Sequence, residues 1–158
     1  MSYVVSGLSG GPFRPLFGLP DDELRARGAT RVIADDDGFY PCRVSLEDAR
    51  PGERLLLVNF EHLPAPASPY RSRHAIFVRE NAAEAARIEG RMPAVLSTRR
   101  QIALRAYDQT GFMLDADIVP GPEVEAAALR LLEDRQVAFL HAHNPARGCY
   151  AARIDRLP

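Results

Sequence analysis

Apolar and polar residues along this chain alternate with a period of two or form short continuous apolar runs, and both patterns indicate β-strands. The clearest runs are Arg54 to Phe60 (RLLLVNF) and His74 to Val78 (HAIFV), which are apolar on both faces, as is typical of strands covered on both sides. The proline-rich segment Leu63 to Pro69 between them predicts an extended loop. Further strands are expected at Tyr3 to Ser6, Arg31 to Ala34, Cys42 to Ser45, Ile102 to Tyr107, Phe112 to Val119 and the C-terminal end.

A hairpin is predicted where Ile102 to Tyr107 and Phe112 to Val119 flank the sequence DQTG, which suits a four-residue turn. Alternation along both strands predicts one shared apolar face. That face would contain Ile102, Leu104, Ala106, Phe112, Leu114, Ala116 and Ile118.

Two helices are predicted among the strands. Glu123 to Asp134 places apolar residues at helical spacing, and Asp21 to Arg27 begins with acidic residues and ends before Gly28. Shorter helical turns are expected near Asn81–Arg87 and Pro93–Arg99. The fold class is therefore α+β: a single globular domain over residues 1–158, with a largely antiparallel or mixed sheet, two main helices and short helical turns.

Composition narrows the function classes. Of 158 residues 46% are hydrophobic and the net charge is −1, so the basic surplus expected of a nucleic-acid-binding protein is missing. All 20 basic residues are arginines, which excludes a Schiff-base lysine and a lysine-dependent phosphate loop. No run approaches the roughly 18 apolar residues of a membrane span. We therefore expect a cytoplasmic protein whose partners include neither membrane nor nucleic acid, and whose two cysteines, Cys42 and Cys149, are thiols.

The segment Val137 to Arg156 (VAFLHAHNPARGCYAARIDR) has the highest density of chemically active side chains. If Val137 to His143 is a strand, Val137, Phe139, His141 and His143 share a face, with both imidazoles at the strand end. The following loop adds candidate ligand-binding groups, Asn144 and Arg147, and the thiol Cys149. His141, His143 and Cys149 are the candidate catalytic residues, although the same loop could be a structural turn in which Cys149 simply packs.

A second candidate cluster is PYRSRH, in which Arg71, Arg73 and His74 precede an apolar strand. Guanidinium groups in such a corner can bind a carboxylate or phosphate, while the alternative is that they form surface ion pairs. The leading hypothesis is a pocket in which this cluster and the histidine segment bind a small anionic molecule. A histidine could serve there as general acid or base.

Two other functions are consistent with the sequence. A metal-dependent enzyme could combine His141 and His143 with Asp115 or Asp117, a two-histidine, one-carboxylate ligand set. A non-enzymatic interaction module would instead use the arginines against a protein partner. The sequence identifies no cofactor, assigns no metal ligand beyond that alternative, and decides neither the oligomeric state nor whether the protein is an enzyme.

Five blocks of the sequence resemble one family. They are FRPLFGL (Phe13 to Leu19), PCRVSLED (Pro41 to Asp48), PGERLLLVNFEH (Pro51 to His62), PYRSRHAIFVRE (Pro69 to Glu80) and HAHNPARGCYAA (His141 to Ala152). They are similar to the bacterial family catalogued as domain of unknown function 1203. The resemblance covers nearly the whole chain and implies a stand-alone bacterial protein of about this length. It carries no established activity and therefore assigns no catalytic residue.

Overall fold

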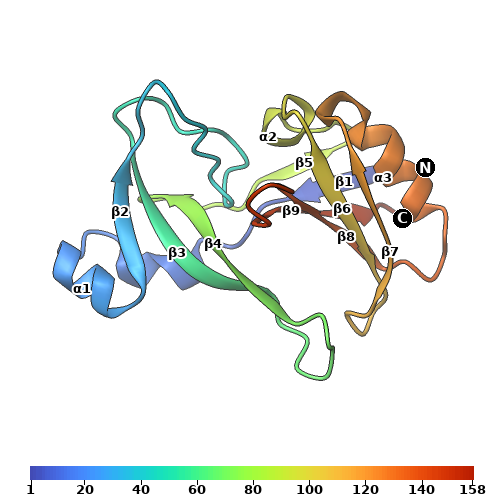
Figure 1. The fold of residues 1–158 in the computed structure, drawn as a ribbon, viewed down its shortest axis with the longest axis horizontal. Helices are drawn as coiled ribbons and strands as arrows, with labels where there is room; N and C mark the ends of the chain where they lie inside the picture. Colours follow the sequence, from blue (N-terminus) through green and yellow to red (C-terminus); the bar gives the residue numbers. More distant parts are fainter.

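A computed structural model describes all 158 residues and arranges them in two antiparallel sheets that lie side by side (Figure 1). The six-stranded sheet has the order β5-β1-β9-β8-β6-β7, and the three-stranded sheet has the order β2-β3-β4. The strands of the first are β1 (Tyr3–Ser6), β5 (Arg87–Glu89), β6 (Ile102–Tyr107), β7 (Met113–Val119), β8 (Phe139–His143) and β9 (Tyr150–Arg156). Those of the second are β2 (Ala29–Ile33), β3 (Arg54–Leu63) and β4 (Ser72–Arg79).

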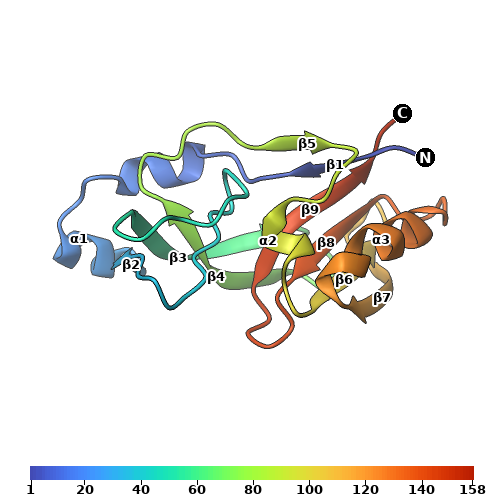
Figure 2. The same cartoon turned by 90° about the horizontal axis from the view of Figure 1, so that it is seen from above.

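One face of the six-stranded sheet is covered by helix α3 (Val124–Leu132) and the short helix α2 (Ala94–Ser97) (Figure 2). A 3-10 turn, Gly121–Glu123, leads into α3. The apolar face of α3 packs on alternate sheet residues, because every second side chain of a strand points to the same side. The sheet residues of this core include Leu104, Ala106, Leu140, Ala142 and Ile154.

A second core lies under the three-stranded sheet. Leu56 and Val58 of β3 and Ile76 and Val78 of β4 pack there with residues from the 3-10 helix Gly11–Leu16 and from helix α1 (Asp21–Ala26). Tyr150 of β9 also belongs to this core, although it comes from the six-stranded sheet. The two sheets therefore share a packed boundary at the start of β9.

The sequence-based prediction of an α+β fold with antiparallel pairing is confirmed, and β1 and β6 have the predicted bounds. The expectation of two main helices is not confirmed, because α3 has 9 residues while α1 has 6 and α2 has 4. Strands dominate the architecture.

Two local predictions are wrong. Cys42 to Ser45 is a turn, since Leu46 N–H donates to Cys42 O and Leu46 adopts a φ of 55°. The segment Asn81–Arg87 is not helical, because Asn81 has a φ of 71°, which breaks helical geometry, and Arg87 begins β5. Both errors come from residues in the left-handed region, which apolar periodicity does not detect.

The predicted shared face of the β6–β7 hairpin is also wrong. Leu104 lies opposite Asp117, and Ala103 lies opposite Ile118, with a register irregularity between Ala106 and Tyr107. A shift of one residue transfers a whole set of side chains to the other face of a sheet. Leu114 and Ile118 are consequently 36% and 57% exposed on the edge strand β7. None of the helices is both long enough and apolar enough to span a bilayer.

Candidate metal centre

All four histidines of the chain meet at the boundary between the two sheets. His62 comes from β3, His74 from β4, and His141 and His143 from β8. The ring centroid of His62 lies 5.0 Å from His74, 5.5 Å from His141 and 5.0 Å from His143. Residues separated by up to 81 positions thus form one histidine cluster.

Strand geometry explains how β8 contributes two imidazoles. Phe139, His141 and His143 alternate with Leu140 and Ala142, which face α3. This confirms the predicted shared face, except that Val137 precedes the strand and packs in the core under α3. The histidine face of β8 is then closed by the three-stranded sheet.

His62 follows Leu56, Val58 and Phe60 at every second position of β3, next to a β-bulge. Pairing between β3 and β4 is regular up to Phe60 opposite His74, then shifts before Leu63 pairs with Ser72. Bulges bend a strand and redirect side chains. His62 stacks on His74 and, with ring centroids 5.1 Å apart, on Tyr150.

Three of these histidines bring ring nitrogens close to one another. His62, His141 and His143 are 6%, 2% and 0% exposed, and one nitrogen from each lies within 4.8 Å of the others. Nδ1 of His62, Nδ1 of His141 and Nε2 of His143 are buried and have no hydrogen-bond partner. Leaving a buried polar atom unpaired costs about 1–3 kcal/mol, so this arrangement opposes folding unless something binds there.

The second ring nitrogen of two of these histidines is anchored. His143 Nδ1–H donates to Gly148 O at 2.9 Å, and Nε2 of His62 lies 2.8 Å from Nδ1 of His74. Gly148 has a φ of 77°, which lets the β8–β9 turn bring its carbonyl back to His143. A histidine that binds a metal through one nitrogen characteristically hydrogen-bonds a protein group through the other.

Burial favours the neutral form of the imidazoles of His62, His141 and His143. Burial lowers the pKa of His62 to about 4 and that of His143 to about 3, and it lowers the pKa of His141 well below its usual value. The mutual proximity of the rings and the positive charge of Arg105 on β6 lower these pKa values further. Neutral imidazoles keep the lone pairs that metal ions require.

The structure separates Arg71 and Arg73 from the histidines. Arg71 donates to Glu61, and Arg73 donates to Asn59 Oδ1 at 2.7 Å, while their side chains are 53% and 56% exposed. Arg73 and His74 are adjacent in β4 and so point to opposite faces. Of the three residues predicted to form an anion-binding corner, only His74 reaches the cluster.

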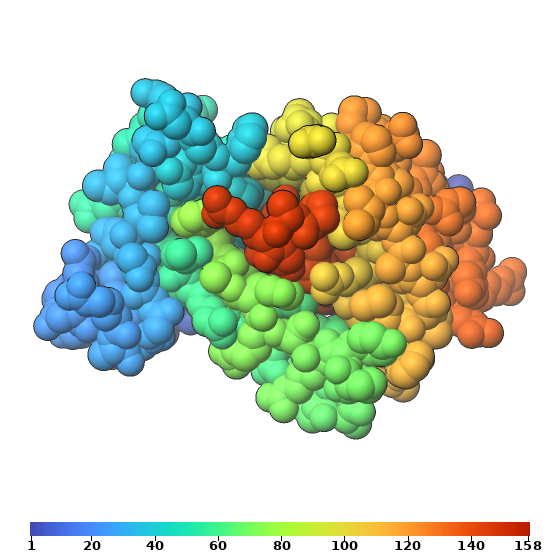
Figure 3. All heavy atoms as spheres, in the orientation of Figure 1, coloured from blue at the N-terminus to red at the C-terminus, as the bar shows by residue number.

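The remaining candidates lie in the β8–β9 loop, the red surface segment at the centre of Figure 3. Arg147 is exposed. Cys149 Sγ accepts hydrogen bonds from the buried Arg43 at 3.2 Å and from Asn144 Nδ2 at 3.5 Å. Cys149 is not part of the group formed by His62, His141 and His143, whose nitrogens could hold a metal ion. Both Cys42 and Cys149 are free cysteines.

The predicted pairing of His141 and His143 with an aspartate does not occur. Asp117 lies opposite Leu104, which lies opposite Ala142, so the aspartate is on the face of β7 away from the histidines. Asp117 instead accepts a hydrogen bond from Arg130 of α3 at 2.5 Å, and Asp115 lies on the same face of β7, on the side of the sheet that α3 covers. The third ring of the group is His62, which sequence analysis did not select. The sequence signal for His62 is its spacing, since it follows Leu56, Val58 and Phe60 at every second position of β3.

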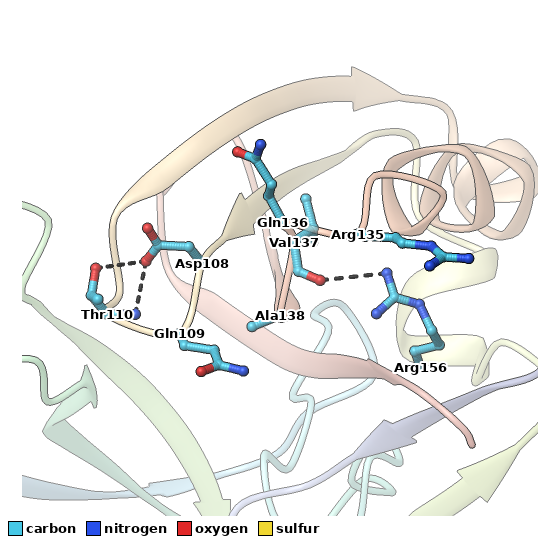
Figure 4. Close-up of a pocket in the computed structure, with 8 residues that line it drawn as sticks. All are labelled: Asp108, Gln109, Thr110, Arg135, Gln136, Val137, Ala138 and Arg156. Carbon is cyan, nitrogen blue, oxygen red and sulfur yellow. Dashed lines mark hydrogen bonds between the residues drawn. The ribbon is translucent and has the colours of Figure 1, made fainter.

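A surface hollow of about 450 Å³ lies at the other end of β8, beside the start of the strand (Figure 4). Two of its polar groups are bonded within the chain: Asp108 accepts hydrogen bonds from Thr110, and Arg156 donates to Val137 O at 3.4 Å. The hollow contains no histidine or cysteine. It is a less reactive environment than the histidine cluster.

Comparison with known proteins identifies a family and no described activity. The family model described as protein of unknown function (DUF1203) matches residues 39–156, which include all four histidines and most of both sheets. No curated protein and no solved structure matches the chain.

Proposed function

This chain belongs to the DUF1203 family, whose description assigns no function, and we propose that it binds a divalent transition-metal ion through His62, His141 and His143 and uses the ion to activate water for hydrolysis. The observation that supports this most strongly is the convergence of three buried, neutral imidazoles whose free nitrogens have no other partner. Imidazole ligands suit zinc, copper, iron and nickel.

The dimensions of the group are compatible with a metal after a small contraction. Zinc–nitrogen bonds of ~2.0–2.1 Å in a tetrahedral site place ligand nitrogens about 3.3–3.4 Å apart. The three nitrogens lie within 4.8 Å of one another, so side-chain rotations that move the nitrogens by about an ångström would bring them to metal-binding distances. The anchors on His143 and His62 keep two rings oriented during that closure.

The number of ligands favours a reactive centre over a purely structural one. Structural zinc sites have four protein ligands, whereas catalytic sites have three and keep a position for water or substrate. A zinc-bound water has a pKa near 7, so hydroxide is available at neutral pH. With only neutral ligands, the full charge of the ion acts on that water. His74, hydrogen-bonded to His62, would orient a ligand rather than act as one.

Elemental analysis of tag-free protein purified without chelator tests this proposal. We expect about one zinc or other first-row metal ion per chain, and its loss from His62→Ala, His141→Ala and His143→Ala proteins that keep their circular dichroism. Zinc-loaded protein should also hydrolyse an activated ester such as p-nitrophenyl acetate faster than the three variants. Metal-free wild-type protein that takes up no added zinc would rule the proposal out, as would variants that retain the metal.

A further inference from the structure

Arg105 occupies a distinctive position beside the histidine cluster. In the β6 register it lies opposite His141 of β8 on one side and opposite Ala116 of β7 on the other. Side chains of directly paired residues lie on the same face of a sheet. Arg105 therefore projects from the face that carries His141 and His143, on the side nearer the sheet edge formed by β7.

This guanidinium has no carboxylate partner. None of the ion pairs of the protein includes Arg105, whereas Arg31, Arg79, Arg99 and Arg153 each pair with an acid. Its partners in the sheet register, His141 on β8 and Ala116 on β7, carry no carboxylate either. The partly buried site consequently carries positive charge that the chain itself does not balance.

Arg105 also lies near the boundary between the sheets, because its partner in the register, His141, is one of the four clustered histidines. The immediate neighbours of Arg105 along β6 and across to β7 on that face include the small residues Ala103 and Ala116.

We propose that Arg105 binds the anionic group of the substrate, a carboxylate or a phosphate, next to the metal position. A planar guanidinium donates two parallel hydrogen bonds to either group. This inference rests on the proposed metal function, since the bound ion and Arg105 would flank the substrate with two positive centres. It assigns the anionic-ligand role to Arg105 in place of Arg71 and Arg73, whose charges are directed to Glu61.

Calorimetric titration of zinc-loaded protein with inorganic phosphate, and separately with acetate, tests the inference. We expect one of these anions to bind wild-type protein, and Arg105→Met to weaken that binding by about tenfold or more, with zinc content unchanged. Arg73→Met is the matched control and should bind as wild type does. Stronger binding of phosphate identifies a phosphate-bearing substrate, and stronger binding of acetate identifies a carboxylate.

Two outcomes would overturn the role of Arg105: binding of neither anion by wild-type protein, or equal affinity in wild type and Arg105→Met. If Arg105→Met does not fold, Arg105→Gln provides the same comparison. Failure of the metal proposal gives a different signature, because the wild-type protein would then contain no zinc. Repeating the titration on that protein would still compare Arg105 with Arg73.

Discussion

The two faces of the β3–β4 pair carry polar clusters that differ in burial, in charge and in hydrogen bonding. On the outer face, Glu61 accepts a hydrogen bond from the exposed Arg71 and forms an ion pair with the exposed Arg73, so charges are paired in contact with water. On the inner face, His62 and His74 meet the β8 histidines in a buried cluster with three unpartnered nitrogens. Glu61 and His62 are adjacent in the sequence but lie on opposite faces. The same is true of Arg73 and His74.

This difference separates a structural cluster from a functional one. Surface ion pairs contribute little to stability and need no further explanation. Buried polar groups without partners are unfavourable, so their persistence indicates a role outside stability. The histidines are therefore the candidate functional residues, rather than Arg71 and Arg73, which the sequence had suggested.

The largest expected effect is loss of metal binding on removal of a ligand from the inner cluster. His62→Ala should weaken zinc binding by more than the ~10–100-fold typical of a residue that only orients a ligand. Calorimetric titration of the metal-free protein with zinc measures this. Glu61→Gln, one residue away on the outer face, is the control and should bind zinc as wild type does; equal losses in both variants would erase the distinction between the faces.

A large but different effect is expected when the two faces of β8 are compared by stability. Leu140→Ala, in the core under α3, should lower the unfolding free energy by roughly 2–5 kcal/mol because it leaves a cavity. His141→Leu should leave the metal-free protein as stable as before or stabilise it, since an unpaired buried polar atom is removed. Chemical denaturation of both variants measures these changes. A loss for His141→Leu as large as that for Leu140→Ala would mean that the histidine is structural.

An intermediate effect is expected for the residue that anchors a ligand. His74→Ala removes the partner of His62 Nε2 and should weaken zinc binding by about 10–100-fold without abolishing it. The zinc titration should show the wild-type stoichiometry with a reduced affinity. Complete loss of binding would make His74 a ligand, and no change would show that the hydrogen bond does not matter.

Acidification should affect the inner cluster first. Its histidines have pKa values lowered by burial, so between pH about 6.5, where unfolded histidine titrates, and about 4 for His62, the unfolded state binds more protons than the folded state. The metal-free protein should therefore lose stability as the pH falls through this window. Denaturation midpoints at pH 7.5, 6 and 5 should decline in wild type and decline less in His62→Leu; parallel curves would contradict the assignment.

The smallest effect is expected on the outer face. The hydrogen bond from Arg71 lowers the pKa of Glu61, so its stabilising contribution is retained above the usual glutamate range and lost only at lower pH. Because the pair is exposed, Arg71→Ala should leave the melting temperature near that of wild type and leave zinc binding unaltered. A marked fall in either quantity would show that the outer cluster supports the inner one.

The alternation of residues along the sequence predicted part of this site. Period-two alternation correctly placed His141 and His143 on one face, because strand geometry alone decides that. It did not by itself identify His62, which lies on the same face of β3 as Leu56 and Val58 and meets the β8 histidines only through packing between the two sheets. Nor could it show that Arg71 and Arg73 face Glu61, since an arginine-rich segment reads the same whether its partners are ligands or acids of the chain.

The same limit explains the error in the β6–β7 hairpin. The β6–β7 strands were recognised, but one register irregularity placed Leu114 and Ile118 on the opposite face from the one predicted. That irregularity also separates Asp117 from the histidines, which removes the carboxylate from the anticipated ligand set. Elements follow from local sequence, whereas the combination of side chains into a site follows from register and sheet packing.

X-ray absorption at the zinc edge of the zinc-loaded protein identifies the atoms that coordinate the metal. Coordination by His62, His141 and His143 predicts three imidazole nitrogens at about 2.0–2.1 Å, one further light atom from water, and no sulfur at about 2.3 Å. A sulfur shell would place the metal at Cys42 or Cys149, and a shell of oxygen atoms alone would place it on surface carboxylates. Either result would contradict the assignment of the histidine cluster as the metal centre.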